Sequence, residues 1–464
     1  MAKANQLSGV TKWLVREEWA ATFEELLQLH LEAPCTAADV RIDELADVIG
    51  DAFMSNLFLC VLEDMLATEF EDGSNIVDDY LKRRGWKEPV PNKRYMTALR
   101  SSVMSLYEVS DIVRDRSFLA RDLLRGGEPV LVSEKLATRD MKPWDLFAAR
   151  IVKVGSRTEM AGGVLPFSRE IGESIREGFA ELREKMRAPV HSWQEQQGGA
   201  ELDPYAFDTE VLRRAAFLFS NTWLEDLLQK VLDPTLPMLT NSDGDTIEFV
   251  TVRYPLRPGA DRKALGDGIA AIPGFRASAD DHWDWGGPPA TSKPDNESED
   301  VEQLTVLLPD GSILLATVEL EGDSLRVETN SQQRAERARA LLDPVIGPFV
   351  AEPVVEARTV EEMMDSRPAE GELPPLPGVS PEEERKFVHE SLDRHYRAVL
   401  DQPVPALGDV SPRESAKTTD GRERLVGWLK GLENANAQLE SDSAIASYDV
   451  SWLWEELGVS GQRR

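Results

Sequence analysis

The sequence predicts a multidomain α+β protein, and three observations carry this prediction. Its 464 residues are enough for about three domains of ordinary size. The spacing of apolar residues switches from a helical period to short valine-rich runs and back along the chain. Two polar, proline-containing stretches, residues 288–302 and 367–384, interrupt these patterns and are typical of linkers. We expect a helical N-terminal region, a small β-sheet or barrel unit, an antiparallel meander with a helix, and a helical C-terminal domain.

The N-terminal region, residues 1–116, carries apolar residues at three- and four-residue steps. Trp13 and Trp19 belong to the first amphipathic face of this kind. Residues 43–70 are apolar along most of their length, which predicts a buried central helix. Residues 95–113 continue the helical period, so we predict helices throughout this region.

Residues 117–235 change to short runs rich in valine that are separated by glycine-containing turns. A glycine pair at 126–127 introduces one run and Gly155 follows another, which favours a small sheet or barrel. Helical periodicity returns over 168–186 and 209–232. This part therefore predicts a small β unit with flanking helices.

Residues 236–366 predict an α+β sheet unit. Turns containing Asp-Gly or Gly-Asp separate its apolar runs, and such turns are a strong signal for hairpins. Asn330 or Ser331 is the expected N-cap of a helix over 332–345 that ends at Gly347. The expected strands cover residues 246–256, 304–308, 313–320 and 325–328.

Residues 385–464 follow the second linker as a helical domain. Ser411 is the expected N-cap of a short helix, with Pro412 at its first position. A break at residues 420–421 separates it from a longer amphipathic helix over 422–439. The pattern predicts a compact module of helices joined by tight turns.

Strings within this C-terminal domain resemble the signature of a known group. They lie at 405–408 (PALG), 411–414 (SPRE) and 420–422 (DGR). Together they resemble the PALGG-x-TPREA…GR pattern of uncharacterised bacterial proteins of the SEC-C-motif-associated type. The segment is also similar to the toxin-binding domain of Xre/MbcA/ParS antitoxins. The resemblance implies a protein-binding surface and no established activity.

The chain departs from both groups. The cysteine-rich zinc motif of the first group is absent, because the chain has only two cysteines. An antitoxin of the second group is expected to carry a DNA-binding helix-turn-helix before this segment, and a long acidic region stands there instead. Zinc binding is therefore not carried over from the resemblance.

The net charge, the number of cysteines and the lack of long apolar stretches argue against several classes of protein. The chain has 52 basic and 83 acidic residues, a formal net charge of −31, which repels nucleic acid and anionic membranes at long range. Cys35 and Cys60 lie in apolar helical contexts, which predicts two buried thiols rather than a disulfide scaffold. The N-terminal segment has no apolar core like that of a signal peptide, and no stretch approaches the ~18 apolar residues of a membrane helix. We expect a cytoplasmic protein that does not bind membranes.

The strongest candidate metal ligands are Asp280, His282 and Asp284, with Asp243 and Asp245 in a nearby turn. Adjacent residues on an extended chain point to opposite faces, so only part of this set can converge on one ion. The plainer interpretation, which we favour, is an acidic loop beside a half-buried tryptophan pair. We expect no metal and no cofactor.

Residues 81–100 carry a local excess of positive charge in which Trp86 and Tyr95 are interleaved. Basic residues beside aromatics suit a phosphate backbone with stacked bases. They suit equally well an acidic surface of the same chain or of a protein partner, which the net charge favours. The candidate phosphate contacts are Arg83, Arg84, Lys87, Lys93 and Arg94. Three further arginines, Arg334, Arg337 and Arg339, are expected to be solvated on one helix.

The chain contains no P-loop, no G-x-G-x-x-G and no G-x-S-x-G, and we identify no catalytic residue. The leading hypothesis is a non-enzymatic bacterial protein with a docking or regulatory role, antitoxin-like at its C-terminus, that binds another protein. Its candidate contact residues are Leu407, Pro412, Arg413, Arg422 and Trp428. The alternatives are a nucleic-acid-associated protein using the basic stretch, and a metal-dependent hydrolase.

Overall fold

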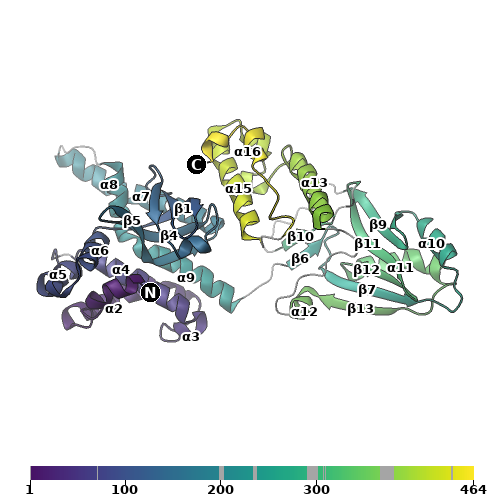
Figure 1. Ribbon diagram of the computed structural model, residues 1–464, viewed down its shortest axis with the longest axis horizontal. Coiled ribbons are helices and arrows are strands. Elements are labelled where there is room, and N and C mark those ends of the chain that lie inside the picture. The colour runs from purple at the N-terminus through teal and green to yellow at the C-terminus, as the bar shows by residue number, and fades with distance from the viewer. Residues whose placement is uncertain are drawn as a thin grey trace. The chain divides into compact units, whose positions relative to one another are not determined.

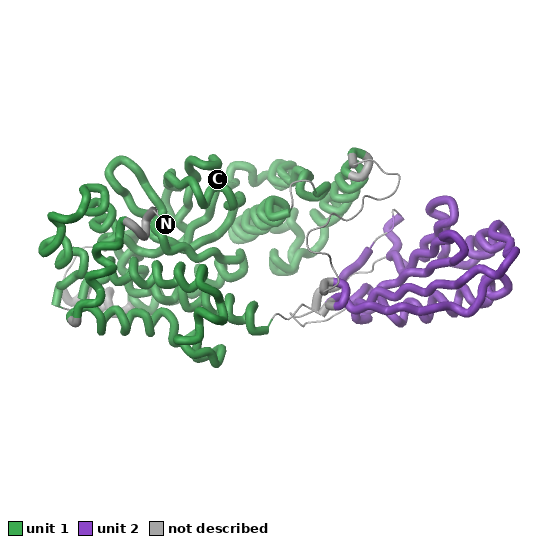
Figure 2. Tube along the Cα trace, turned by 60° about the horizontal axis from the view of Figure 1, so that its bottom comes forward, with its two compact units in different colours: residues 1–234, 375–464 green, residues 235–374 purple. Residues whose placement is uncertain are grey.

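The computed structural model describes residues 2–70, 72–197, 203–233, 238–289, 301–306, 308, 310–365, 381–439 and 443–463. The chain forms two compact units (Figure 2). Unit 1 comprises Met1–Pro234 and Pro375–Arg464, and unit 2 comprises Thr235–Pro374. The finer five-part division of the sequence stays a prediction. Residues 290–300 and 366–380, which make up most of the two expected linkers, lie outside the described residues.

The fold class is confirmed: helices combine with two antiparallel sheets of five and six strands and with a helical C-terminal region (Figure 1). None of the helices among the described residues is long and apolar enough to span a bilayer.

The N-terminal helices of unit 1 pack around α4, which is the buried central helix that the sequence predicts. Every residue of α4 from Cys60 to its end is buried, and the second thiol, Cys35, is buried as well. The helices are α1 (Ala2–Thr11), α2 (Glu17–Ala37), α3 (Leu45–Ile49), α4 (Asp51–Ala67), α5 (Ile76–Arg84) and α6 (Val90–Arg100), with a 3₁₀ turn at Gly85–Lys87.

The helix predicted over 95–113 is wrong in its second half. Helix α6 ends at Arg100, and Met104 begins a ten-residue strand. The first six residues of this strand are all buried, because it is covered on both faces. Burial on both faces hides the two-residue alternation of a strand, and apolar residues at three-residue steps then imitate a helix.

The small β unit is an open five-stranded sheet in the order β3-β2-β1-β4-β5. Its edge strands β3 and β5 approach each other, but no ladder of hydrogen bonds closes a barrel among the described strands. The strands are β1 (Met104–Val113), β2 (Ser117–Asp122), β3 (Val130–Ser133), β4 (Leu146–Val154) and β5 (Arg157–Phe167). The flanking helices are confirmed as α7 (Arg169–Gln197), α8 (Pro204–Arg214) and α9 (Ala216–Leu232).

Strand β5 crosses α4 so closely that a glycine is required at the crossing. A Cβ atom at Gly163 would lie 2.8 Å from the Cys60 sulfur and 2.9 Å from its backbone nitrogen. The Glu63 side chain accepts a hydrogen bond of 2.6 Å from the backbone nitrogen of Gly162 at the same place. Helix and sheet therefore share one core here, in which burial raises the pKa of the Cys60 thiol well above its ordinary value.

The C-terminal helices form a module with its own apolar core, which is built from residues between Leu400 and Val459. Its caps follow the sequence prediction, since the Ser411 side chain accepts a hydrogen bond from the backbone nitrogen of Glu414. The predicted break lies slightly earlier than expected, because Thr418 caps the long helix. The elements are α13 (Pro381–Val399), α14 (Pro412–Ser415), α15 (Thr419–Gln438) and α16 (Trp452–Glu456), with 3₁₀ turns at Pro405–Leu407 and Ser460–Gln462.

Unit 2 is a six-stranded antiparallel sheet in the order β13-β7-β12-β11-β9-β8, with α10 and α11 packed on one face. Of the predicted meander, the runs over 313–320 and 325–328 correspond to β11 and β12. The strand predicted over 304–308 is wrong: β10 ends at Leu304 and pairs in parallel with β6 in a separate two-stranded sheet, and the described residues of 305–308 are not in a strand. Ser331, one of the two predicted caps, caps α11. The strands are β6 (Met238–Asn241), β7 (Glu248–Pro255), β8 (Phe275–Ala279), β9 (His282–Pro289), β10 (Val301–Leu304), β11 (Ser312–Glu321), β12 (Ser324–Thr329) and β13 (Val354–Thr359). The helices are α10 (Arg262–Ala270), α11 (Gln332–Ile346) and α12 (Val360–Asp365).

Candidate functional site at the junction of the C-terminal helices

The residues predicted to bind a partner serve the fold of the C-terminal module. Leu407 and Pro412 are buried, and Leu407 belongs to the core of the module. Trp428 is half-buried and packs against the same core. Replacing any of these three would disturb the module itself, so their predicted docking role stays a prediction.

The two predicted arginines also have internal partners. Arg413 forms ion pairs with Asp401 at 3.2 Å and with Glu456 at 2.7 Å. The Nε of Arg422 donates a hydrogen bond of 2.6 Å to the carbonyl oxygen of Ala416. These contacts hold the turns between the helices of the C-terminal module, so both arginines have a structural role.

A site that the sequence does not reveal lies where α15 meets the five-stranded sheet. The ammonium group of Lys430 on α15 forms an ion pair with the carboxylate of Glu108 on β1. The two side chains are only 8% and 5% exposed. Burial lowers the pKa of Lys430, although the attraction of Glu108 opposes this shift. Arg169 at the start of α7 is a second cation on Glu108, at 3.3 Å.

A second cluster at this junction is centred on Glu433. One oxygen of its carboxylate accepts a hydrogen bond of 2.6 Å from the indole nitrogen of Trp144. The other oxygen accepts a hydrogen bond of 2.8 Å from Trp454 and lies 2.8 Å from a nitrogen of Arg463. Glu433 therefore ties the loop before β4 to the core of the C-terminal module.

The loop before β4 is held in an unfavourable conformation at this point. Trp144 has a φ of +67°, in the left-handed region, which is rare for a bulky residue. Such strain costs on the order of 1–3 kcal/mol and persists only where neighbouring contacts enforce it. Here Asn434 donates to the carbonyl oxygen of Pro143 and to Asp145, both at 2.8 Å, and Gln438 donates to Asp145 at 3.0 Å.

The junction is incompletely packed, and apolar as well as polar side chains border its cavities. A cavity of about 380 Å³ lies beside Asp145, Arg169 and Asn434. A second one of about 770 Å³ lies beside Asp111 and Glu433. The module has a separate apolar core, and hydrogen bonds and ion pairs connect it to the sheet and to the loop before β4.

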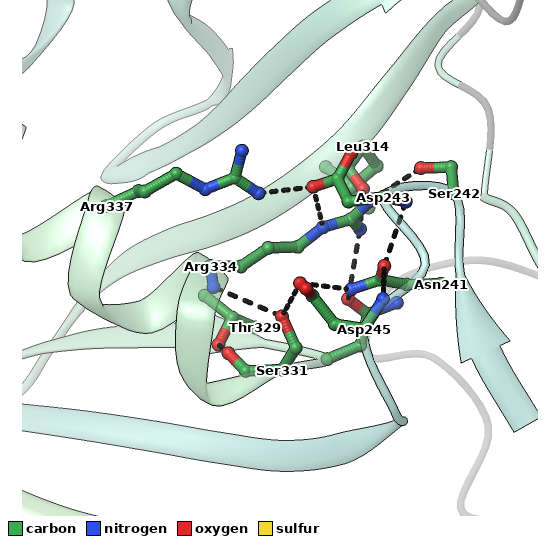
Figure 3. Close-up of polar contacts among 10 residues, drawn as sticks. Asn241, Ser242, Asp243, Asp245, Leu314, Thr329, Ser331, Arg334 and Arg337 are labelled. Atoms are coloured by element: carbon green, nitrogen blue, oxygen red, sulfur yellow. Dashed lines mark hydrogen bonds and ion pairs between the residues drawn. The ribbon is translucent and has the colours of Figure 1, made fainter.

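In unit 2, the prediction that the arginines of α11 are solvated is wrong for Arg334. Its guanidinium group is buried and donates to Asp243 and Ser242 at 3.1 and 2.6 Å (Figure 3). It also donates to Asn330 at 2.9 Å. Its neighbour Arg337 remains half-exposed and also forms an ion pair with Asp243. An arginine can be buried here because every side of its charge meets an acceptor.

The same cluster explains the acidic turn at the end of β6. Ser331 and Asn241 both donate to the carboxylate of Asp245, at 2.8 and 3.1 Å (Figure 3). Burial acts to raise the pKa of Asp243, but the hydrogen bonds from its two arginines outweigh it and hold that pKa below its ordinary value. Both carboxylates thus clamp the turn to the start of α11 and are not directed at a metal ion.

The candidate metal ligands converge only in part. His282 and Asp284 lie on one face of β9 with 3.5 Å between their closest atoms. Asp280 lies in the turn before β9, beside Asp281, which is 3.5 Å from Arg262. The described part of the chain contains no group of three or more His, Cys, Asp or Glu side chains that could hold a metal ion.

The basic stretch is partly neutralised within unit 1. Arg83 forms ion pairs with Asp79 at 2.7 Å and Glu18 at 3.1 Å, and Arg84 lies over the ring of Trp13. Lys87 lies near the ring of Trp86, 5.0 Å from its centroid. No ion pair is found for Lys87, Lys93 or Arg94 among the described residues, and Trp86 is 74% exposed.

The sequence also does not predict a buried network of hydrogen bonds between side chains inside unit 1. His30 lies 2.6 Å from the Ser220 hydroxyl through one ring nitrogen and 3.2 Å from Asp64 through the other. Asp64 is in turn paired with the buried Arg150 at 2.5 Å. The order serine, histidine, aspartate is that of a hydrolase triad, but all three side chains are buried and line neither junction cavity. The chain of hydrogen bonds therefore holds α2, α4, α9 and β4 together.

A family model matches part of the chain. Residues 61–195 match the model of a family of unknown function, DUF7986. The matched part is less than a third of the chain and contains Glu108, Trp144 and Arg169, the sheet side of the junction. No curated protein matches the chain. The resemblance of the C-terminal segment stays a prediction.

Proposed function

We propose that this chain is a non-enzymatic bacterial protein that binds another protein, and that its C-terminal module is the part that engages the partner. The single observation that carries the proposal is the set of ion pairs and hydrogen bonds that connects α15 to the sheet and to the loop before β4. A module with its own apolar core can leave such an interface without unfolding. The antitoxin-like segment lies in this module, which agrees with a docking role.

The energetics of the junction favour exchange over permanent attachment. A buried ion pair such as Lys430–Glu108 gains little net stability, because removing both charges from water offsets their attraction. Hydrogen bonds at the junction contribute about 0.5–1.5 kcal/mol each, or about 1.5–3 kcal/mol where the acceptor is a carboxylate, because water replaces them when the interface opens. A partner that supplies a carboxylate for Lys430 and donors for Glu433 would compete with the sheet.

The surface exposed by such an opening is one row on α15. Lys430, Asn434 and Gln438 follow one another at four-residue steps, and Glu433 lies three residues after Lys430, so all four share one face of the helix. All four contact the sheet or the loop before β4 in the closed arrangement. We therefore assign partner binding to this row rather than to the string from 405 to 422.

The test is affinity capture from a bacterial lysate with nuclease, at low and high salt. Glu108→Gln removes the charge that holds Lys430 and leaves the row on α15 unchanged, so it should increase recovery of a protein partner. Glu423→Gln, an exposed position on the same helix, is the matched control and should recover as much as the wild type. Equal recovery by all three proteins would remove the junction from the proposal.

A second candidate function is nucleic-acid association through the basic stretch. The exposed Trp86, beside Lys87 and near Lys93 and Arg94 in sequence, favours it. Binding should then weaken steeply with salt and be lost when Lys87, Lys93 and Arg94 become alanine. Recovery of nucleic acid at low salt that disappears after nuclease would support this alternative, whereas salt-independent capture of one protein would contradict it.

A further inference from the structure

Strand β13 leaves one edge of the six-stranded sheet open. It pairs with β7 alone among the described strands and lies at the border of the sheet (Figure 1). All six of its residues are exposed, with Val354 at 57% and Val355 at 43%. Its pairing with β7 is regular from end to end, without a bulge. An edge of this kind offers unpaired backbone groups to another strand, and natural proteins usually protect it.

The two faces of β13 carry different residues. Val355 and Ala357 lie on the side that α10 and α11 cover in the rest of the sheet, because Val355 pairs with the buried Val252. Glu356 and Arg358 lie on the opposite, open side. Neither of these charged residues makes an ion pair within the described part of the chain.

We propose that β13 pairs antiparallel with β13 of a second copy of this chain, with Ala357 opposite its own copy. In this register Glu356 of each copy lies opposite Arg358 of the other, so the opposite charges meet twice in the dimer. Val355 lies opposite Thr359 on the other side of the strand. A two-fold axis through Ala357 keeps the helices of both copies on the same face of a continuous sheet.

The charges select this register over its neighbours. A two-fold axis through Glu356 would place two glutamates opposite each other, and one through Arg358 would place two arginines opposite each other. Like charges in directly opposed positions destabilise a strand pair. A single six-residue strand buries less surface than the roughly 1,200 Å² of a stable complex, so the dimer belongs to the weak, concentration-dependent class.

The test is sedimentation of the full-length chain over a range of concentrations. Arg358→Glu and Glu356→Arg each replace both attractive pairs by repulsive ones, and each should weaken dimerisation by about 30-fold. The double variant E356R/R358E should dimerise like the wild type. A mixture of the two single variants should also dimerise, because the chain with two glutamates then faces the chain with two arginines.

The matched control is Glu336→Arg, an exposed position on α11 with the same change of charge, which should leave dimerisation unchanged. A wild type that stays monomeric at every concentration would overturn the proposal, as would a segment of the same chain lying on β13. Single variants that fail to dimerise even when mixed would overturn the proposed register. The inference is independent of the junction in unit 1.

Discussion

Replacing Glu108 and replacing Lys430 should change the docking free energy of the C-terminal module by very different amounts. Glu108→Gln leaves the Lys430 ammonium buried, and no other carboxylate forms an ion pair with it within the described residues. Removing one partner of a buried pair costs about 3–5 kcal/mol. Lys430→Met instead leaves Glu108 with its second cation, Arg169 at 3.3 Å, and removes the cost of burying the lysine. We expect this second change to cost less docking free energy than Glu108→Gln, because the carboxylate that remains keeps a cation.

The other hydrogen bonds at the junction oppose this opening. Those from Trp144 to Glu433 and from Asn434 and Gln438 to Asp145 end on carboxylates and contribute about 1.5–3 kcal/mol each, whereas the one from Asn434 to Pro143 contributes about 0.5–1.5 kcal/mol. Their sum of roughly 5–10 kcal/mol exceeds the loss caused by Glu108→Gln. The module should therefore open more often than in the wild type and should remain folded.

Hydrogen exchange measured on peptides covering 141–146 and the core of the C-terminal module tests this expectation. In Glu108→Gln, exchange should rise at least about tenfold in the loop, a change of about 1.4 kcal/mol, and should not rise in the core of the module. In Lys430→Met, protection of the loop should stay near the wild-type level. Equal protection in Glu108→Gln and the wild type, or greater opening in Lys430→Met, would refute the reasoning.

Three further predictions concern stability. Ser331→Ala removes both the N-cap of α11 and a hydrogen bond to Asp245, so calorimetry should show a loss of about 1–2 kcal/mol in unit 2. Ser278→Ala, at an exposed position on β8, should change the stability little. The pKa of Asp243 is lower in the folded than in the unfolded chain, so its contribution to the free energy of unfolding is complete above the ordinary pKa of about 3.9 and is lost as the pH falls through the folded pKa. Asp243→Asn should therefore make the stability of unit 2 depend less on pH in acid. An unchanged dependence of stability on pH would contradict the role of Asp243 in holding the turn. Gly163→Ala should destabilise unit 1 by about 1–3 kcal/mol, because the added Cβ would collide with Cys60. Gly427→Ala, where a Cβ on α15 meets no other atom, should stabilise the helix by about 0.5–1 kcal/mol. Urea denaturation measures both changes, and equal effects would contradict the close crossing of β5 and α4.

Local chemistry made part of the fold predictable. The caps at Ser331 and Ser411 and the turn between β11 and β12 depend on residues within a few positions of one another, and the structure has them where the sequence predicts. The boundary between α6 and β1 was not predictable in the same way. Burial of β1 on both faces removes the alternation that would have identified a strand.

The candidate site lies beyond what local patterns can reveal. Lys430 and Glu108 are 322 residues apart, and each is an ordinary charged residue in its own segment. His30 and Ser220 meet across 190 residues in the same way. Arg334 resembles an exposed helical arginine until the turn at Asp243 is placed against it. Polar contacts of this kind arise from tertiary packing, which spacing along one sequence does not encode.

The most direct measurement of partner binding by the C-terminal module is the dissociation constant of the recovered partner. It is measured for the wild type, Glu108→Gln and Glu423→Gln. If the partner binds the row on α15, a closed junction lowers its apparent affinity by the fraction of molecules that are open. Glu108→Gln should then bind at least about tenfold more tightly than the wild type, and Glu423→Gln should bind like the wild type. Equal dissociation constants for all three proteins would contradict the assignment of partner binding to this junction.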